Sequence, residues 1–374
     1  MEKPGILILT PDLKVQGGVS NFFEALNLSQ YSGISYFYVS YDRKENSLQA
    51  AWRIVSNYFR FIYILLVRDI SLVHINPSFN SKSFFRDGIF CFLAHILRVK
   101  TLVFFHGWDD AYEERVGNSS FLQSFFKMSF GSSDDIIVLS KIFKQKLIRL
   151  NFEKRIRFHS MTTVADSSFL SQFSIDNKIG SFGSEKTLLF LSRIEDSKGI
   201  FIALEAFRRL EKQYPDLKLI VAGDGNALER SKQFVIDKQI QKVEFTGYVR
   251  GVEKGKILLR SHILLFPTYY GEGMPTNVLE AMLYGMPVVS RNNAGVSDTV
   301  AQNVNGFLTQ SKDPEVFYGF LKTLLDDYNL YQRMARENHQ KAMAEYSSDR
   351  VREKIFSVYQ MILDKPLNYA RLLG

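Results

Sequence analysis

The sequence predicts an α/β protein made of two Rossmann-like, doubly wound domains. Its 374 residues are more than one domain usually holds, and both halves alternate short apolar runs with helical patterns. Such alternation is typical of parallel sheets covered by helices. We expect an N-terminal domain over residues 1–170, a linker over 171–185, a second domain over 186–350 and a last helix over 351–374.

Apolar runs predict the strands of the N-terminal domain at Gly5–Leu9, Tyr36–Val39, Leu72–Ile75, Thr101–Phe105 and Asp135–Leu139. Ligands of such sheets lie beyond the carboxyl ends of the strands, so the residues that follow these runs are candidates for a site. His106 and Asp109 follow one run, and the pair Gly17-Gly18 precedes a helix expected from about Ser20. Two glycines let a backbone approach a ligand closely, although a glycine pair can also simply make a turn.

The second domain opens with a strand, a cationic loop and a helix. The strand is expected at Thr187–Ser192 and the helix at Ile200–Tyr214, with Arg193 and Lys198 between them. Arginine can hold two phosphate oxygens and lysine adds a compact charge, so the loop suits phosphate; the alternative is a surface cation pair. The remaining expected elements are strands at Lys218–Ala222, Val243–Thr246, Ile263–Pro267 and Pro287–Val289, and helical structure from Asp313 to about Lys365.

Two carboxylates, Glu272 and Glu280, surround a helix that is expected from Pro275 to near Gly285. The N-terminus of a helix attracts anions, phosphate above all, through its free N–H groups. The expected donors are the backbones of Gly273, Met274, Thr276 and Asn277. Two carboxylates that accept hydrogen bonds from hydroxyls on either side of a diphosphate would suit a nucleotide-sugar, whereas an ordinary helix with an exposed glutamate is the alternative.

The stretch from Glu272-Gly-Met-Pro-Thr-Asn-Val-Leu-Glu280 to Gly285-Met-Pro-Val-Val289 resembles the E-x7-E signature of the retaining family-4 glycosyltransferases. These enzymes have the GT-B fold, in which two Rossmann-like domains face each other across a cleft. The order of the other motifs agrees along almost the whole chain. The resemblance implies that Glu272 contacts the transferred sugar and that Glu280 contacts the ribose hydroxyls.

The same resemblance implies roles for further residues. Arg193 and Lys198 match the Arg-x4-Lys-Gly motif that binds the diphosphate, and His106 matches a histidine near the transferred sugar. The last helix is expected to cross back to the first domain. Donor contacts are expected at Gly17, Gly18, Gly223, Tyr248 and Val249, and acceptor contacts at Asp109 and Asn21.

The function implied is retaining transfer of a sugar from a UDP-, GDP- or ADP-linked donor to a saccharide or lipid-linked saccharide. The expected context is the biosynthesis of a capsule, an O-antigen, another lipopolysaccharide part or an exopolysaccharide. No Asp-x-Asp motif and no Cys/His cluster is found, so we expect neither metal nor cofactor. Alternatives are a GT-B epimerase or phosphorylase and a non-catalytic protein that binds sugar nucleotides. An epimerase would not require Arg193, Lys198 and Glu272 together.

The net charge of +8 is unevenly distributed. Between Lys141 and Arg157 there are seven basic residues and one acid, and Lys141–Leu150 has the apolar spacing of an amphipathic helix. Such a face can lie on anionic lipid, although a solvated helix is the commoner case. Trp52–Asp69, with arginines among aromatic residues, is a second candidate for membrane contact. No nucleic-acid motif accompanies the charge.

Localisation is predicted from cysteine content and hydropathy. The single cysteine, Cys91, lies in an apolar run and fits a reducing compartment. No N-terminal signal or membrane-spanning segment is recognised, because the longest apolar stretch, Phe59–Val67, is too short. We therefore expect a cytoplasmic protein that is peripheral on the inner face of the plasma membrane.

Overall fold

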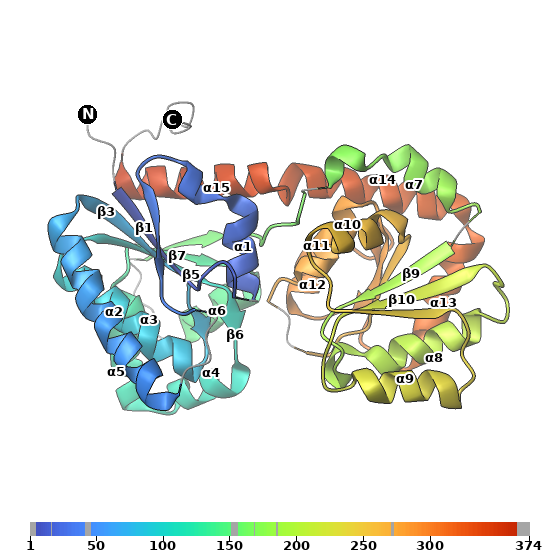
Figure 1. Cartoon of the computed structure of the whole chain (residues 1–374), viewed down its shortest axis with the longest axis horizontal. Helices are drawn as coiled ribbons and strands as arrows, with labels where there is room; N and C mark the ends of the chain where they lie inside the picture. Colours follow the sequence, from blue (N-terminus) through green and yellow to red (C-terminus); the bar gives the residue numbers. More distant parts are fainter. Residues whose placement is uncertain are drawn as a thin grey trace. The chain divides into compact units, whose positions relative to one another are not determined.

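The computed structural model describes residues 5–15, 17–41, 46–150, 156–167, 169–184, 186–270 and 273–364. The chain divides into two compact units, of which the N-terminal unit comprises residues 1–163 and 351–374 and the C-terminal unit residues 164–350. Each unit is built on a six-stranded sheet covered by helices (Figure 1). The mixed α/β class and the two doubly wound sheets agree with the prediction.

The sheet of the N-terminal unit has the strand order β2-β1-β3-β5-β7-β8, and all its pairs are parallel. Its strands are β1 Gly5–Thr10, β2 Ile34–Tyr38, β3 Ile70–Ile75, β5 Lys100–Phe105, β7 Asp135–Val138 and β8 Arg157–Ser160. A second, two-stranded sheet pairs β4 Ser78–Phe79 with β6 Gly107–Trp108. The helices are α1 Gly18–Leu26, α2 Ser47–Val67, α3 Ser81–Ile96, α4 Asp110–Gly117, α5 Ser120–Met128, α6 Lys141–Arg149 and α15 Ser348–Leu363. Strand β8 was not expected, because its four residues are not an apolar run.

Aromatic packing fills the core of the N-terminal unit. The ring of Phe61 on α2 lies 5.9 Å from that of Phe37 on β2 and 5.0 Å from that of Phe90 on α3, measured between ring centroids. The last helix packs on the same unit, since the hydroxyl of Tyr359 on α15 lies 2.7 Å from Nδ1 of the buried His74. The division of the chain therefore places the segment from residue 351 with the N-terminal sheet.

The sheet of the C-terminal unit has the order β11-β10-β9-β12-β13-β14 and is also parallel throughout. Its strands are β9 Lys186–Leu191, β10 Leu217–Ala222, β11 Val243–Gly247, β12 Ile263–Phe266, β13 Val288–Arg291 and β14 Gly306–Thr309. The helices are α7 Ile175–Ser181, α8 Ile200–Leu210, α9 Leu228–Asp237, α10 Gly251–Arg260, α11 Thr276–Leu283, α12 Ala294–Thr299, α13 Pro314–Asp326 and α14 Tyr328–Glu345. Short 3₁₀ turns lie at Leu170–Gln172 and Asp196–Lys198 in this unit, and at Leu28–Gln30 and Phe130–Ser132 in the N-terminal unit. The strand order reverses between β9 and β12, which is where doubly wound sheets bind ligands.

The structure differs from the predicted linker over 171–185. Residues Ile175–Ser181 form α7, and the C-terminal unit already begins at residue 164. Ile179 and Phe182 are buried in the core of this unit, with the ring of Phe182 stacked 3.6 Å from that of Tyr331. The linker was expected because the segment is polar and contains glycine and serine, yet the ammonium group of its Lys178 is buried. It donates to the backbone carbonyls of Leu258, Leu259 and Ser261 at 2.8, 2.6 and 2.5 Å.

Candidate functional site

The candidate site of the C-terminal unit lies where the strand order reverses. Strands β9 and β12 are direct neighbours, so the segments that follow them leave the same edge of the sheet. The backbone N–H groups of Tyr269 and Tyr270 donate to the carbonyl of Ser197 at 2.8 and 3.1 Å. The side-chain amide of Asn277 donates to the carbonyl of Leu191 at 2.6 Å. Loop 192–199 and segment 267–277 are therefore joined at this edge.

Gly199 permits this close approach. It has a left-handed backbone, with φ of 81°, and a Cβ atom built on it would lie 2.3 Å from the carbonyl oxygen of Pro267. Any other residue would force the two loops apart or strain the backbone. The glycine after Lys198 thus has a structural reason as well as a place in the Arg-x4-Lys-Gly motif.

Arg193 and Lys198, the two predicted phosphate ligands, lie beside the same aromatic ring. The ammonium nitrogen of Lys198 is 4.1 Å from the ring centroid of Tyr270, and the guanidinium carbon of Arg193 is 5.8 Å from it. Lys198 is buried, whereas 60% of the Arg193 side chain is exposed and its Nη1 lies 2.7 Å from Oε1 of Glu195. The structure therefore brings both cations together, with Lys198 buried and Arg193 mostly exposed beside the half-buried Glu195.

The start of α11 supplies backbone donors to the same edge. Pro275 is the N-cap residue, and α11 begins at Thr276 as expected. The N–H of Val278 donates to the carbonyl of Pro275 and to Oδ1 of Asn277. Within the described ranges, the N–H groups of Thr276 and Asn277 have no acceptor, as the first turn of a helix requires of groups that await a ligand or water.

Helix α12 packs against Gly273 and Met274, which precede α11. A Cβ atom on Gly295 would lie 1.8 Å from the carbonyl oxygen of Gly273, and the hydroxyl of Thr299 lies 3.0 Å from the sulfur of Met274. The predicted donors Gly273 and Met274 are thus positioned by α12. Glu272 lies outside the described residues, so its contact with the sugar stays a prediction.

Glu280 is buried and paired with a lysine. Its Oε1 lies 2.7 Å from the ammonium nitrogen of Lys254 on α10, which is also 3.3 Å from Oδ2 of Asp166. Burial raises the pKa of Glu280 and outweighs the opposing effect of Lys254. Burial also lowers the pKa of Lys254, but the carboxylates of Glu280 and Asp166 outweigh it and raise the pKa well above its ordinary value. The carboxylate predicted to bind ribose is therefore held in place by a cation.

Gly223 follows β10, and close packing at this position explains why it is a glycine. Its φ is 147°, and a Cβ atom on it would lie 1.8 Å from the carbonyl oxygen of Ser192 in the loop that carries Arg193. The residue thus allows the end of β10 to pack against the cationic loop. Whether its backbone also contacts a donor stays a prediction.

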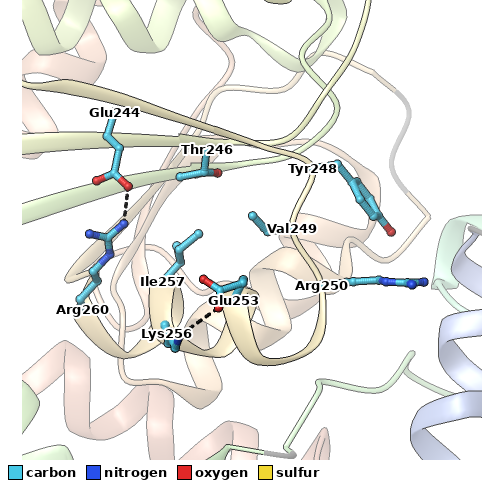
Figure 2. Close-up of a pocket in the computed structure, with 9 residues that line it drawn as sticks. All are labelled: Glu244, Thr246, Tyr248, Val249, Arg250, Glu253, Lys256, Ile257 and Arg260. Carbon is cyan, nitrogen blue, oxygen red and sulfur yellow. Dashed lines mark hydrogen bonds and ion pairs between the residues drawn. The ribbon is translucent and has the colours of Figure 1, made fainter.

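A cavity of about 630 Å³ lies between β11 and α10. Figure 2 shows its lining, in which Arg260 pairs with Glu244 at 2.5 Å and Lys256 with Glu253 at 2.9 Å. Tyr248 and Val249, predicted beside the nucleobase, line it where β11 ends, whereas Arg193 and Lys198 do not line it. The full lining is Glu244, Thr246, Tyr248, Val249, Arg250, Glu253, Lys256, Ile257 and Arg260.

In the N-terminal unit, His106 follows β5 and is a neutral imidazole. Its Nε2 lies 2.9 Å from Oδ1 of Asn76, and the amide nitrogen of Asn76 donates to the carbonyl of Leu9 at 2.9 Å. Oδ1 of Asn76 must therefore accept, which places the proton of His106 on Nε2 and leaves Nδ1 as an acceptor. Burial lowers the pKa of His106 to about 3. His106 is thus suited to accept a hydrogen bond, for example from a hydroxyl, at neutral pH.

The glycine loop lies on the helix that packs against His106. Phe22 of α1 has its ring 5.2 Å from that of His106, and the exposed Asn21 precedes it in the first turn of the helix. Gly17 and Gly18 start α1, and a Cβ atom on either would meet nothing within 4 Å. The fold itself therefore does not require glycine at these two positions.

Asp109 has a structural role that the sequence analysis did not include. It is the N-cap of α4, where its side chain accepts from the N–H of Tyr112 at 3.2 Å. The side chain is exposed, so this cap does not test the predicted acceptor contact.

Lys254 and Asn76 are site residues that the sequence analysis missed as such. Lys254 lies 26 residues before Glu280, on a separate helix, and no local pattern links the two. Asn76 directly follows β3, and its position after a strand end was the one available signal. Within the part of the chain that the structure describes, no group of three His, Cys, Asp or Glu side chains is placed to hold a metal ion.

Comparison with protein families and curated proteins shows that the chain is similar to glycosyltransferases. Residues 171–341 match the family described as "Glycosyl transferases group 1". WcaL of Salmonella typhimurium, named provisionally as a colanic acid biosynthesis glycosyltransferase, is 21% identical over 79% of this chain and 71% of its own. The uncharacterized glycosyltransferase MJ1607 of Methanocaldococcus jannaschii is 24% identical over 53% of this chain, which spans about half of the length of that relative.

Solved structures share the fold over nearly the whole chain. Anabaena HepE in complex with UDP and glucose has a TM-score of 0.71 at 16% identity, covering 96% of this chain and 100% of its own. Sucrose-phosphate synthase from Thermosynechococcus elongatus has a TM-score of 0.72 at 15% identity, covering 97% and 100%. These similarities establish the GT-B fold class of the chain.

Proposed function

We propose that this chain, a member of the glycosyl transferases group 1 family, transfers a sugar from a nucleoside-diphosphate sugar to an acceptor with retention of anomeric configuration. The proposed acceptor is a saccharide or lipid-linked saccharide of a bacterial surface polysaccharide. This context is supported by WcaL, named for colanic acid, and by AmsK of Erwinia amylovora, named for amylovoran biosynthesis, which is 28% identical over 37% of this chain.

The observation that carries the proposal is the junction of two loops at the reversal point of the C-terminal sheet. The loop after β9 brings Arg193 and Lys198, and the loop after β12 brings the free N–H groups of α11. Cations and a helix N-terminus at one place suit a diphosphate. In the proposed reaction they stabilise the negative charge that develops on the nucleoside diphosphate as it leaves. We propose that this needs no divalent cation and no cofactor.

The two glutamates have separate proposed roles. Glu280, held by Lys254, accepts hydrogen bonds from the ribose hydroxyls, and Glu272 contacts the transferred sugar. Tyr248 and Val249 border the base at the end of β11. UDP is the preferred candidate for the nucleotide, because HepE, TarM of S. aureus and pneumococcal GtfA were each solved in complex with UDP.

The N-terminal unit is proposed to bind the acceptor and part of the donor. The glycines at 17 and 18 are not required by the fold, so close approach of a ligand to this backbone is a reason for them. His106, neutral and with Nδ1 free to accept, is proposed to hold a sugar hydroxyl during attack on the same face of the anomeric carbon. Asn21 and Asp109 remain the proposed acceptor contacts. No covalent nucleophile is assigned.

We also propose that the protein works in the cytoplasm, peripheral on the inner face of the plasma membrane. Its cysteine, Cys91, is buried and unbridged, and burial raises the pKa of the thiol to about 12, which suits a reducing compartment without requiring it. The basic segment Lys141–Arg157 was the first candidate for the membrane contact. Some of its charge is used internally, since Lys146 pairs with Asp110 and Glu113, and Arg157 pairs with Asp135.

The test is donor binding and turnover with a panel of UDP-, GDP- and ADP-sugars, with and without EDTA. The variants are Lys198→Ala and Glu272→Ala, and the matched control is Lys232→Ala, an exposed lysine on α9 that pairs with Glu229. We expect one donor to bind, to release nucleoside diphosphate in EDTA, and to lose turnover by roughly 100-fold or more in both site variants but not in the control. The anomer of the product, followed by NMR, tests retention.

Three results would overturn the proposal. Binding of a donor without any turnover by the wild-type protein would favour the non-catalytic alternative, and binding of no donor would rule out both. Full turnover in both Lys198→Ala and Glu272→Ala would mean that these residues do not form the donor site.

A further inference from the structure

Helix α2 exposes a long apolar stripe. Leu48, Trp52, Val55, Phe59, Tyr63 and Leu66 recur every three or four residues, which places them along one face of the helix. Their exposed fractions run from 44% for Val55 to 82% for Leu48, with Trp52 at 74% and Phe59 at 70%. Soluble proteins seldom expose so many large apolar side chains in one continuous row. Such a stripe is typical of a surface that contacts a partner molecule.

The opposite face of α2 is built into the N-terminal unit. Asn57, Phe61 and Leu65 are buried, and the ring of Phe61 packs on Phe37 and Phe90. The hydroxyl of Tyr58 donates to the carbonyl of Arg86 on α3 at 3.2 Å, and Nη1 of Arg53 donates to the carbonyl of Val39 at 2.6 Å. The sequence analysis judged the apolar stretch Phe59–Val67 too short to span a membrane, but among the described helices the whole of α2, Ser47–Val67, is long and apolar enough to cross a bilayer by length and composition. Leaving the unit to do so would break this packing, so a helix lying flat on a surface satisfies both faces.

The charge around the stripe is positive. Helix α3 packs against both α2 and α5 (Figure 1), and the one acidic residue within the bounds of these three helices is Asp87, which is buried and paired with Arg86 at 2.7 Å. Exposed apolar side chains also occur on the other two helices, namely Phe85 and Ile96 on α3 and Phe121 and Met128 on α5. The exposed basic residues of these helices are Arg60, Lys82 and Lys127.

We propose that the stripe on α2 docks the protein on an anionic lipid bilayer, with α2 parallel to the membrane plane. Tryptophan and tyrosine favour the interface between acyl chains and headgroups, and the long side chains of arginine and lysine reach the anionic headgroups from there. Within the bounds of α2, α3 and α5 the exposed charged groups are all basic, and the exposed Asp69 that follows α2 stands next to the exposed Arg68, so the surface matches this partner in charge. The inference moves the membrane contact from the basic helix α6 to α2, and it does not depend on the proposed donor chemistry.

The features of α2 favour lipid over a second copy of the chain. Two such faces would bring arginine and lysine against arginine and lysine, because these helices hold no exposed acid with which to pair them. A bilayer that contains anionic lipid removes this repulsion and gives an attraction that falls with salt. A dimer is therefore treated as a competing outcome of the experiment.

The experiment measures co-sedimentation of the full chain with large vesicles of phosphatidylcholine alone or mixed with phosphatidylglycerol. The test variant combines Trp52→Ser, Phe59→Ser and Leu66→Ser, all at exposed positions. A matched control combines Ile236→Ser, Val252→Ser and Met343→Ser, three exposed apolar residues of the C-terminal unit. We expect the test variant to bind mixed vesicles about 100-fold more weakly and the control to bind as the wild type does. Wild-type binding should weaken as salt is raised.

Fluorescence adds a readout at the stripe itself. The chain has two tryptophans, so the difference between the wild type and Trp52→Phe isolates residue 52, whose emission should move to shorter wavelength on vesicles. The proposal is wrong if the wild type ignores mixed vesicles at low salt, or if the test variant binds them unchanged. It is also wrong if the wild type is a dimer in solution that the test variant dissociates, because the stripe would then be covered by a second copy. Circular dichroism of each variant confirms that it is folded.

Discussion

The ammonium nitrogen of Lys254 lies 2.7 Å from Oε1 of Glu280, and both groups are largely withdrawn from water. This ion pair links α10 to α11, the helix whose first turn forms part of the predicted phosphate site. The pairing means that the carboxylate assigned to ribose does not rotate freely before a nucleotide arrives. It also leaves one residue, Lys254, on which both stability and the proposed ribose contact of Glu280 depend.

Lys254→Met should destabilise the C-terminal unit by roughly 3 kcal/mol, because it leaves the buried Glu280 without its cation. The loss should shrink as the pH falls: burial raises the pKa of Glu280, so acid protonates the folded state first and removes the unpaired charge. Urea unfolding followed by hydrogen exchange of α10 and α11 amides measures both effects.

The control for this pair is Lys256→Met on the same helix. Lys256 pairs with Glu253 at 2.9 Å, but both side chains are more than half exposed. Its loss should change stability by less than about 0.5 kcal/mol. Equal effects of the two substitutions would show that the buried pair has no special importance.

Glu280→Gln and Lys198→Ala should separate ribose binding from phosphate binding. Lys198→Ala should weaken the affinity for nucleoside diphosphate and for inorganic pyrophosphate alike, because both carry the diphosphate. Glu280→Gln should weaken nucleoside diphosphate by roughly tenfold and leave pyrophosphate unchanged, since pyrophosphate has no ribose hydroxyls. Isothermal titration calorimetry with the two ligands gives the comparison. Loss of pyrophosphate binding in Glu280→Gln would contradict the assigned roles.

Gly199→Ala should destabilise the C-terminal unit by at least about 2 kcal/mol, because the new Cβ atom would meet the carbonyl of Pro267 in a left-handed conformation. Gly319→Ala on α13 is the matched control. Its Cβ atom would meet nothing within 4 Å, and alanine should stabilise this helix by about 0.5–1 kcal/mol. Thermal unfolding by circular dichroism should therefore move in opposite directions for the two variants.

The N-terminal unit should lose stability as the pH falls below 6.5. Burial lowers the pKa of both His74 and His106 to about 3, so these groups stay neutral in the folded unit while the unfolded chain takes up protons. Each should cost about 1.4 kcal/mol per pH unit between those two values. Both tryptophans, Trp52 and Trp108, lie in this unit, and their fluorescence follows its unfolding in urea.

His74→Gln should reduce this pH dependence by about one proton, because the variant lacks a group that stays neutral in the folded unit while the unfolded chain takes up a proton. A pH dependence that is the same in His74→Gln and in the wild type would contradict the buried neutral state of His74.

Much of the fold follows from the order of apolar runs and glycines. The predicted strands at residues 72–75, 101–105, 218–222 and 263–267 agree with β3, β5, β10 and β12 within a few residues. Helix α11 starts at Thr276, after Pro275, and Gly285 follows its end with φ of 68°. Such local rules succeed because a proline at a helix start and a left-handed glycine after its end act within a few residues. The prediction of a linker over 171–185 was wrong because the ammonium group of Lys178 donates hydrogen bonds to carbonyls about 80 residues away, which no local pattern reveals.

By itself, the sequence determined two α/β units, a cationic loop with Arg193 and Lys198, and a carboxylate, Glu280, in the second turn of a helix. Tertiary structure alone decided that Glu280 pairs with Lys254, that Arg193 and Lys198 share the ring of Tyr270, and that α2 keeps one apolar face uncovered. The physical reason is how far apart along the chain the interacting residues lie. Helix ends and strand runs are set by neighbours along the chain, whereas ion pairs and exposed faces are set by which distant elements pack together.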